Sequence, residues 1–259
     1  MSQNLKEKVR VLARLVAAQE EEDTLEEAQK KTWKEEDMVG LDTRCTTKEA
    51  FMCRRCEDRI RGYLYKTCSD VRNSPVYRRE DGHRLREVLE AAIADLKRAL
   101  AGERYMGHYF DRNCTYGKMA LCDRRGKFSC AGAWDAGRCN HRNGKGHTIN
   151  PYRSREQRIV FSTWNLDHRI ERARSIVPAL LGAAVLRTVL RVNTDYFFRL
   201  LFTHHNLGLV HIVCHEKSAR PSASCDPDQT VLVALTTVDG QKKGGGGGWA
   251  QTTERAVSA

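Results

Sequence analysis

Hydrophobic residues recur at helical spacing near the start of the chain. Leu5, Val9, Leu12 and Val16 fall three or four positions apart, which predicts an amphipathic helix over residues 4–31. The far end of this segment is rich in glutamate and lysine, so its charged face is expected to contact solvent. The apolar stripe is too narrow to form a core alone. We therefore expect an arm that packs against another element or against a second copy of the chain.

Two more helices are predicted in the first hundred residues. In the first, Thr46 and Glu49 have the spacing of a capping box, and the apolar stripe that follows consists of Phe51, Ile60, Tyr63 and Leu64. The second spans residues 81–100, with Asp81 as the predicted N-cap. Its predicted buried face consists of Leu85, Leu89, Ile93, Leu96 and Leu100.

The pattern changes after the third helix. Residues 104–152 are rich in glycine, cysteine, asparagine and aromatic residues, which predicts short strands and turns. The elements predicted beyond them are a strand at 158–166, a helix at 169–190 kinked at Pro178, a helix capped by Thr194, and a strand-like run at 209–214. Five consecutive glycines, Gly244–Gly248, predict a flexible tail. Long helices followed by short strands favour an α+β fold.

The composition narrows the choice of partner and of compartment. The chain of 259 residues has a formal net charge of +11 and a pI of about 9.3. This charge favours an anionic partner, either nucleic acid or an acidic membrane surface, although a solvated basic face explains it as well. No apolar run reaches the ~18 residues that span a membrane, and no apolar signal core follows Met1, so we expect neither membrane insertion nor secretion. Ten cysteines in such a chain indicate metal ligands and free thiols instead of disulfides.

Cysteine and histidine residues offer two candidate metal sites. Cys53 and Cys56 have the spacing of half a zinc site, but they lie within a helical pattern and no second pair follows, so the sequence does not favour a metal site there. A dispersed set has the three thiols and one imidazole that suit tetrahedral Zn²⁺, namely Cys130, Cys139, His147 and Cys214. Spacing does not select this set, and buried structural cysteines remain the alternative.

Two short segments end in residues typical of hydrolytic chemistry. Asp167-His168 ends one apolar run, and the block NLGLVHIVCHEK places Asn206 before Cys214-His215. Together they resemble the two halves of the HNH nuclease pattern, which implies hydrolysis of phosphodiester bonds. A neutral His168 suits the general base, because the ordinary pKa of histidine lies near neutral pH. Asp167 and His215 are candidate ligands of Mg²⁺ at the scissile phosphate, and the Asn206 amide is expected to hold the loop that carries His168.

Further motifs are similar to the caspase-activated DNase family over most of residues 45–228. They are YFDR, FSC, INPYRSREQRIVFSTWNLDH, YFFRLLFT, NLGLVHIVCHEK and CDP. The resemblance implies a ββα-metal (His-Me finger, HNH-like) catalytic domain preceded by a small helical dimerisation region, and cleavage of double-stranded DNA in apoptotic DNA fragmentation. We accordingly expect residues 1–45 to form the helical dimerisation region, 46–235 the nuclease domain with a structural zinc, and 236–259 the flexible tail.

The resemblance also assigns site residues. It implies that His211 and Lys48 join the catalytic group. His141 competes with His147 for the fourth zinc position, and His147 is favoured because the motif INPY follows it. The implied zinc ligands are Cys130, Cys139, His147 and Cys214, and the implied catalytic group is Asp167, His168 and His215.

Three arginines follow the predicted catalytic strand. The resemblance implies that Arg169, Arg172 and Arg174 lie on a helix in the DNA major groove. Arginines placed there mostly bind phosphates and add affinity without much sequence choice. A solvated helix face is the alternative reading of the same residues.

The expected partners are double-stranded DNA and a second copy of the chain. In the family, an N-terminal CIDE-N domain binds the inhibitor and chaperone subunit of the DNA fragmentation factor. The sequence begins beyond that position, so control through that domain is not expected. The basic nuclear-targeting tail of the family is reduced here to Lys242-Lys243, and we expect the nucleus and the cytoplasm as locations. A different class of function stays open, namely a zinc-stabilised DNA-binding or dimerisation module without catalytic activity.

Overall fold

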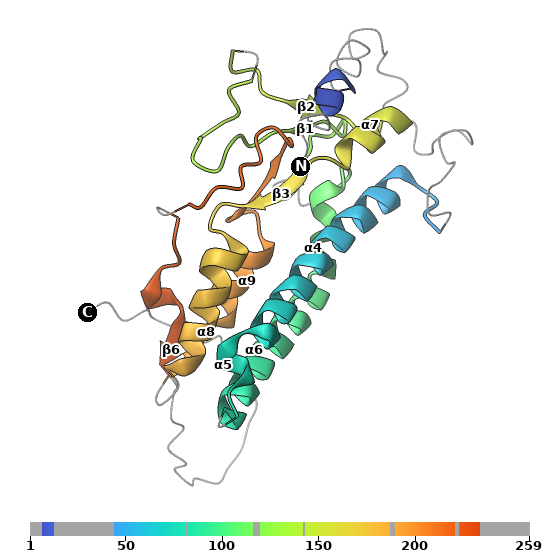
Figure 1. The fold of residues 1–259 in the computed structure, drawn as a ribbon. Helices are drawn as coiled ribbons and strands as arrows, with labels where there is room; N and C mark the ends of the chain where they lie inside the picture. The colour runs from blue at the N-terminus through green and yellow to red at the C-terminus, as the bar shows by residue number, and fades with distance from the viewer. Residues whose placement is uncertain are drawn as a thin grey trace, which may run out of the picture.

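A computed structural model of the chain shows a mixed architecture of helices and small sheets (Figure 1). Two long helices, α4 (Lys48–Asn73) and α6 (His83–Gly102), lie side by side, and α8 (Val177–Val185) and α9 (Thr194–Phe202) pack against them. The α+β fold expected from the sequence is confirmed. The structure describes residues 7–12, 44–80, 82–115, 120–141, 143–186, 190–220 and 223–233.

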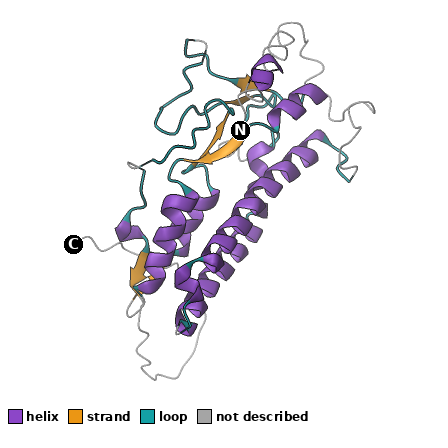
Figure 2. Cartoon of the chain, viewed as in Figure 1, coloured by secondary structure: helices purple, strands orange, loops and turns teal. Residues whose placement is uncertain are grey.

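The strands of the described residues form three separate two-stranded antiparallel sheets (Figure 2). The pairs are β1 (Phe128–Ser129) with β2 (Thr148–Ile149), β3 (Asn165–His168) with β5 (Leu207–Val210), and β4 (Leu190–Val192) with β6 (Val231–Val233). In the second pair Asp167 lies opposite Gly208, and His168 lies opposite Leu207. This pairing brings together the two distant segments that carry the predicted catalytic residues.

Short helical segments connect the longer elements, and all but the last of them contribute residues to the hydrophobic core or pack against it. They are α5 (Pro75–Arg78), the 3-10 helix η1 (Arg104–Phe110), α7 (Arg155–Phe161), the π-helical turn η2 (Arg172–Ile176) and the 3-10 turn η3 (Pro227–Gln229). Tyr109, Phe110 and Tyr152 are among the largest fully buried side chains of the core. Within the described ranges, no helix combines the length and the hydrophobicity needed to cross a bilayer.

The two long helices begin at caps other than those predicted. Thr47, not Thr46, caps α4, because its Oγ1 accepts a hydrogen bond from the backbone N of Ala50 at 3.1 Å. Glu49 does not complete a capping box and instead forms a 2.7 Å ion pair with Arg112. The N-cap of α6 is Gly82, and the predicted cap Asp81 lies outside the described residues. The predicted buried face of α6 is confirmed at Leu85, Leu89, Ile93, Leu96 and Leu100.

Cys53 and Cys56 both lie on α4, where Cys56 is buried and Cys53 is half-buried. The Cys56 side chain is fully buried and its Sγ donates to the carbonyl oxygen of Met106 at 3.2 Å. Burial raises the pKa of the Cys53 thiol to about 12. Among the described residues, neither thiol belongs to the group of side chains that could hold a metal ion, in agreement with the sequence, which did not favour a metal site there.

The predicted strand at residues 158–166 is wrong. Its first part is the last portion of helix α7, which starts where the Ser154 Oγ accepts a hydrogen bond from the Gln157 backbone N at 3.3 Å. Strand β3 begins only at Asn165 and ends at His168. The cap at Ser154 and the packing of Val160 and Phe161 against the core outweigh the strand preference of these apolar residues.

Three later boundaries also differ from the prediction. The predicted helix 169–190 is divided into η2 and α8, and Pro178 lies in the first turn of α8, where a missing N–H costs little, so it makes no kink. Asn193, not Thr194, caps α9 through its Oδ1. The run 209–214 is strand only up to Val210, and residues 211–214 form a turn.

The predicted arm and tail are largely beyond what the structure describes. Residues 7–12 are helical and Val9 is buried, as the periodicity predicts. The rest of the helix predicted at 4–31 and the tail predicted at 236–259 lie outside the described residues.

Candidate active site and metal centre

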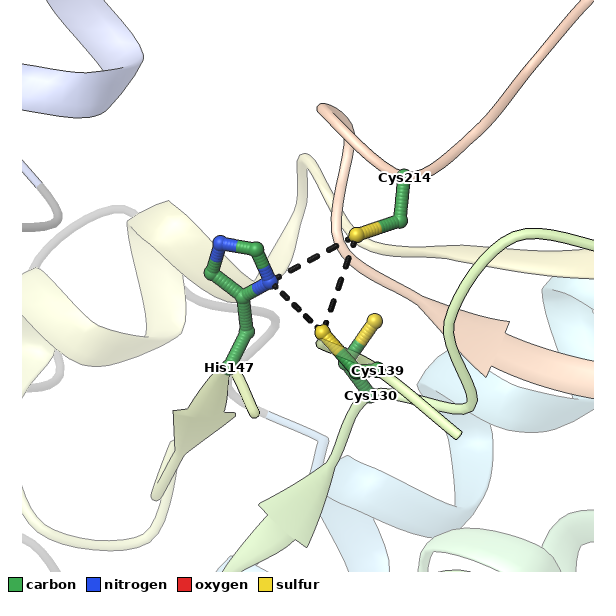
Figure 3. A group of neighbouring side chains, drawn as sticks. All are labelled: Cys130, Cys139, His147 and Cys214. Atoms are coloured by element: carbon green, nitrogen blue, oxygen red, sulfur yellow. Dashed lines mark hydrogen bonds between the residues drawn. The ribbon is translucent and has the colours of Figure 1, made fainter. Parts of the chain in front are cut away.

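Four side chains from three separate segments meet beyond the ends of β1, β2 and β5 (Figure 3). They are Cys130, Cys139, His147 and Cys214, and their ligand atoms all lie within 4.8 Å of one another. The Cys139 and Cys214 sulfurs are 3.8 Å apart, and His147 Nδ1 lies 3.2 Å from the first and 3.5 Å from the second. A tetrahedral Zn²⁺ with bonds of ~2.3 Å to sulfur and ~2.0 Å to nitrogen would separate its ligand atoms by ~3.5–3.8 Å. The donor set and its spacing therefore fit such an ion.

The backbone around Cys130 favours the thiolate that a metal requires. Hydrogen bonding with the Cys214 and His147 side chains, and with the N–H groups of His211 and Gly132, lowers the pKa of Cys130 well below its ordinary value. Both N–H groups donate to the sulfur at 3.3 Å. Gly132 has φ +86°, and a Cβ there would lie 2.7 Å from the Arg138 carbonyl carbon, so only glycine fits this turn.

Two further histidines stack on His147 without entering the four-residue cluster. The His141 ring lies 3.8 Å from the His147 ring on one side, and the His211 ring lies 4.2 Å from it on the other. Of the two histidines that competed for the fourth position, the structure brings His147 to the thiols. The His211 ring packs against the rings of His147 and Trp164. These described ring contacts place His211 beside the four-residue cluster and do not join it to Asp167.

Asp167 lies near the end of β3, where its carboxylate has two different partners. Its Oδ1 is 3.4 Å from His215 Nε2, and its Oδ2 accepts a 2.6 Å hydrogen bond from Arg220. Burial raises the pKa of this carboxyl, but the bonds from His215 and Arg220 outweigh it and lower the pKa below its usual value. Asp167 is therefore an anion that faces an imidazole from the segment after β5.

His168 is the last residue of β3. Because successive side chains of a strand point to opposite faces, the His168 side chain contacts different residues from Asp167. Its ring lies 4.8 Å from the Tyr63 ring, and its Nε2 is 2.9 Å from the carbonyl oxygen of Leu201. Because a carbonyl can only accept, Nε2 is assigned the proton and Nδ1 keeps the lone pair. Burial lowers the pKa of His168 to about 4, so the ring is neutral at pH 7 and able to accept a proton.

Asn206 holds the turn that follows His168. Its Oδ1 accepts from the Ile170 backbone N at 2.7 Å, and its Nδ2 donates to the carbonyl oxygens of Ile170 at 3.0 Å and Leu200 at 2.8 Å. The Asn206 carbonyl also accepts from the Arg169 backbone N at 2.8 Å. These contacts are the ones expected of an amide that fixes the loop beside His168.

Lys48 lies on the same helix as the residue that contacts His168. Lys48 is buried in the first turn of α4, fifteen residues before Tyr63, whose ring packs on His168. The contacts described above for Asp167, His168 and His215 do not include Lys48, so its place in the catalytic group stays a prediction of the resemblance.

The three arginines after β3 have different surroundings. Arg169 is exposed, and Arg174 is 54% exposed beside Glu171 and the Lys217 carbonyl. Arg172 is only 16% exposed and forms a 2.5 Å ion pair with Asp70 of α4. Arg169 lies in the bend after β3, and Arg172 and Arg174 lie in the π-helical turn η2. The regular helix predicted to carry all three arginines is therefore not formed.

Arg220 is a residue that the sequence interpretation missed. It lies in an irregular segment five residues after His215, where no motif or periodicity points to a buried cation. Its side chain is 2% exposed and donates to the carboxylate of Asp167. Only the tertiary structure places this guanidinium at the candidate site.

Comparison with known proteins identifies the family of the chain. The family profile described as DNA fragmentation factor 40 kDa matches residues 1–232. The DNA fragmentation factor subunits beta of Bos taurus and Homo sapiens are each 40% identical over 190 residues, which is 73% of this chain and 52% of theirs. The crystal structure of caspase-activated DNase matches with a TM-score of 0.69 and 31% identity, over 86% of this chain and 90% of that chain.

The match to the solved structure and the match to the curated sequences differ in coverage. The chain spans about half the length of the curated relatives that it matches. The family profile nevertheless extends over most of the sequence, and it includes every residue of the two candidate centres described above. On these grounds, the chain belongs to the DNA fragmentation factor 40 kDa family.

Proposed function

We propose that this chain is a metal-dependent endonuclease that hydrolyses phosphodiester bonds of double-stranded DNA, in apoptotic DNA fragmentation. The similar solved structure is named caspase-activated DNase, and the relatives are named DNA fragmentation factor subunits. The observation that carries the proposal is the meeting of Asp167 and His215, 3.4 Å apart, beside a neutral buried His168. Family membership and this geometry support the same reaction.

The pair Asp167–His215 suits a catalytic divalent cation. Octahedral Mg²⁺ with ligands at ~2.1 Å places neighbouring ligand atoms ~3.0 Å apart, so the observed 3.4 Å requires only a small shift. One carboxylate and one imidazole leave room for the waters and phosphate oxygens that Mg²⁺ prefers. When bound, such an ion supplies Lewis-acid stabilisation of the charge that develops on the scissile phosphate.

The role proposed for His168 is that of the general base. Nδ1 accepts the proton of the attacking water, while Nε2 keeps its hydrogen bond to the Leu201 carbonyl and so fixes the ring. The Tyr63 ring packs edge-on against this imidazole and limits its rotation. Attack by water leaves a 5′-phosphate and a 3′-hydroxyl.

The four-residue cluster is proposed to hold a structural Zn²⁺. Cys214 is one of its members and is directly followed by His215, so an ion at Cys214 fixes the backbone that carries the catalytic imidazole. The His147 ring between His141 and His211 is held in the plane that points Nδ1 at the sulfurs. His211 is proposed to support this centre by stacking.

The partners proposed for the chain are double-stranded DNA, a second copy and an inhibitor subunit. The net charge of +11 favours the DNA. The relatives are named as subunits of a factor, which supports assembly with another subunit. The nucleus and the cytoplasm remain the proposed locations.

Magnesium dependence is tested with purified protein on naked plasmid. Protein freed of loosely bound divalent ions is expected to leave supercoiled DNA intact, and added Mg²⁺ is expected to restore nicking and linearisation. End-labelling of the products is expected to reveal 5′-phosphates. If the protein binds DNA but never cuts it with Mg²⁺ or Mn²⁺, the alternative of a zinc-stabilised DNA-binding or dimerisation module is correct.

The arginines after β3 are expected to differ in their contribution to DNA affinity. Arg169→Gln removes an exposed cation and should reduce the slope of log K against log salt by about 1. Arg172→Gln should change that slope little and lower the melting temperature, because Asp70 loses its partner. Fluorescence anisotropy with a labelled duplex at several salt concentrations measures both. Equal slopes for Arg169→Gln and the unmodified chain would remove Arg169 from the interface.

A further inference from the structure

Arg220 joins the segment after β5 to the end of β3. Its Nη2 donates to Asp167 Oδ2 at 2.6 Å and to the Glu216 carbonyl at 3.0 Å. Its Nη1 donates to the carbonyl oxygen of His168 and lies 3.4 Å from that of Arg169. One guanidinium thus contacts the backbone on both sides of the proposed active site.

The same side chain also contacts the loop of the four-residue cluster. Its guanidinium carbon lies 5.6 Å from the centre of the Trp134 ring, and Trp134 lies between Cys130 and Cys139 in the sequence. The Arg220 Nε is buried without a hydrogen-bond partner among the described residues. An orphaned donor costs stability, so the side chain is placed for the contacts of its two Nη groups.

These contacts give the two oxygens of the Asp167 carboxylate different partners. Oδ2 is committed to Arg220, and Oδ1 is left facing His215 Nε2. A carboxylate held in this way presents Oδ1, and not Oδ2, toward His215. The planar fork of arginine supplies the two directed donors that a lysine ammonium lacks.

We infer that Arg220 is a positioning residue that fixes Asp167 Oδ1 and the end of β3 for the catalytic cation, an inference that rests on the proposed ion site. It acts through Asp167 and the His168 backbone and touches neither ion nor DNA. Two physical effects oppose each other here. The positive charge of Arg220 repels a divalent cation, whereas its hydrogen bonds orient the ligand. Whether the affinity for the cation falls or rises when Arg220 is replaced shows which effect is larger.

The test measures Mn²⁺ affinity of the full chain by the electron paramagnetic resonance signal of free Mn²⁺, without DNA. Loss of a hydrogen-bond partner behind a metal ligand typically weakens metal binding by ~10–100-fold, and this is the expectation for Arg220→Gln. Arg220→Lys keeps the charge but not the fork, and it should bind at least threefold more weakly than the unmodified chain. Asp167→Asn should abolish the site, and Asp167→Asn combined with Arg220→Gln should be no worse.

A matched control is offered by Arg112, another buried arginine paired with a carboxylate. The Arg112 side chain is 6% exposed and lies 2.7 Å from Glu49, which belongs to the first turn of α4 and not to the segments that carry Asp167 and His215. Arg112→Gln should leave Mn²⁺ affinity unchanged even if it lowers the melting temperature. Zinc content and circular dichroism of each variant establish that the protein measured is folded.

The outcomes separate this inference from the proposed function. Unchanged or tighter Mn²⁺ binding by folded Arg220→Gln, or by Arg220→Lys if the glutamine variant unfolds, would overturn the positioning role. Equal losses in Arg112→Gln would do the same, and unfolding of both Arg220 variants would assign the residue to stability. If Asp167→Asn itself retains full affinity, the proposed ion site is wrong, and the failure lies with the function instead.

Discussion

Replacing His168 with asparagine is expected to reduce Mg²⁺-dependent DNA cleavage by ~10²–10⁴-fold, the usual contribution of a general base. Asparagine is polar enough for the site but has no nitrogen that accepts a proton at neutral pH. The Asp167–His215 pair and the exposed arginines are untouched, so DNA affinity should be retained. Initial rates of plasmid nicking measure the first effect, and anisotropy of a labelled duplex without Mg²⁺ measures the second.

His205 provides the matched control for this experiment. It is an exposed histidine whose ring stacks on that of His204, and its side chain has no described contact with Asp167, His168 or His215. His205→Asn should cut plasmid at the rate of the unmodified chain. Nicking by His168→Asn at an undiminished rate would refute the assignment of the base, whereas loss of both cleavage and secondary structure would show a folding role.

Replacing Cys130 with serine is expected to remove the zinc and to unfold the region around it. A structural zinc site can contribute ~10–16 kcal/mol of apparent binding free energy, and this energy is folding energy where the site does not form in the unfolded chain. The described residues between β1 and β2 form bends and turns and no helix or strand, so the proposed ion would be their main fixed point. We expect zinc content near zero by mass spectrometry and a large fall in the melting temperature.

The control for this variant is Cys122→Ser, which alters a half-buried thiol outside the four-residue cluster. It should keep one zinc per chain and show at most a small thermal shift. A normal melt together with full zinc content in Cys130→Ser would exclude Cys130 as a ligand. Loss of zinc from the Cys122 variant as well would indicate a general instability of the chain.

Local sequence signals located the helices but not their ends. The apolar period of α6 gave its buried face correctly, because Leu89 and Ile93 repeat every turn and need only a neighbouring helix. The caps were displaced by one residue at Thr47 and at Asn193. At these sites adjacent polar residues are chemically able to cap, and the packing of the whole helix selects one of them.

The misassigned strand shows where periodicity fails. Ile159, Val160 and Phe161 form a short apolar run, which suits a buried strand and a buried helical turn equally well. In the structure Ile159 is exposed while Val160 and Phe161 face the core. This arrangement belongs to a helix, and the sequence alone does not contain the information on which side the core lies.

For the candidate sites, the sequence indicated which residue types are reactive but not which of them meet in space. The residue types of the Asp167-His168 and Cys214-His215 pairs indicated hydrolytic and metal chemistry, and the resemblance to a known family grouped the four cysteine and histidine residues. Their meeting required tertiary structure, since Cys139 and Cys214 are 75 positions apart in the sequence. The same tertiary structure placed the Tyr63 ring of α4 against His168, a contact that no local pattern indicated.

By itself, the sequence determined the helical periods, the basic charge and the chemical types of the reactive side chains, because these properties are local to a residue or to a few turns. The tertiary structure alone decided which oxygen of Asp167 faces His215, which histidine reaches the thiols and where Arg220 lies. Those outcomes depend on contacts between distant segments. Such contacts form only when the β3–β5 pairing and the helical core fix the segments relative to each other.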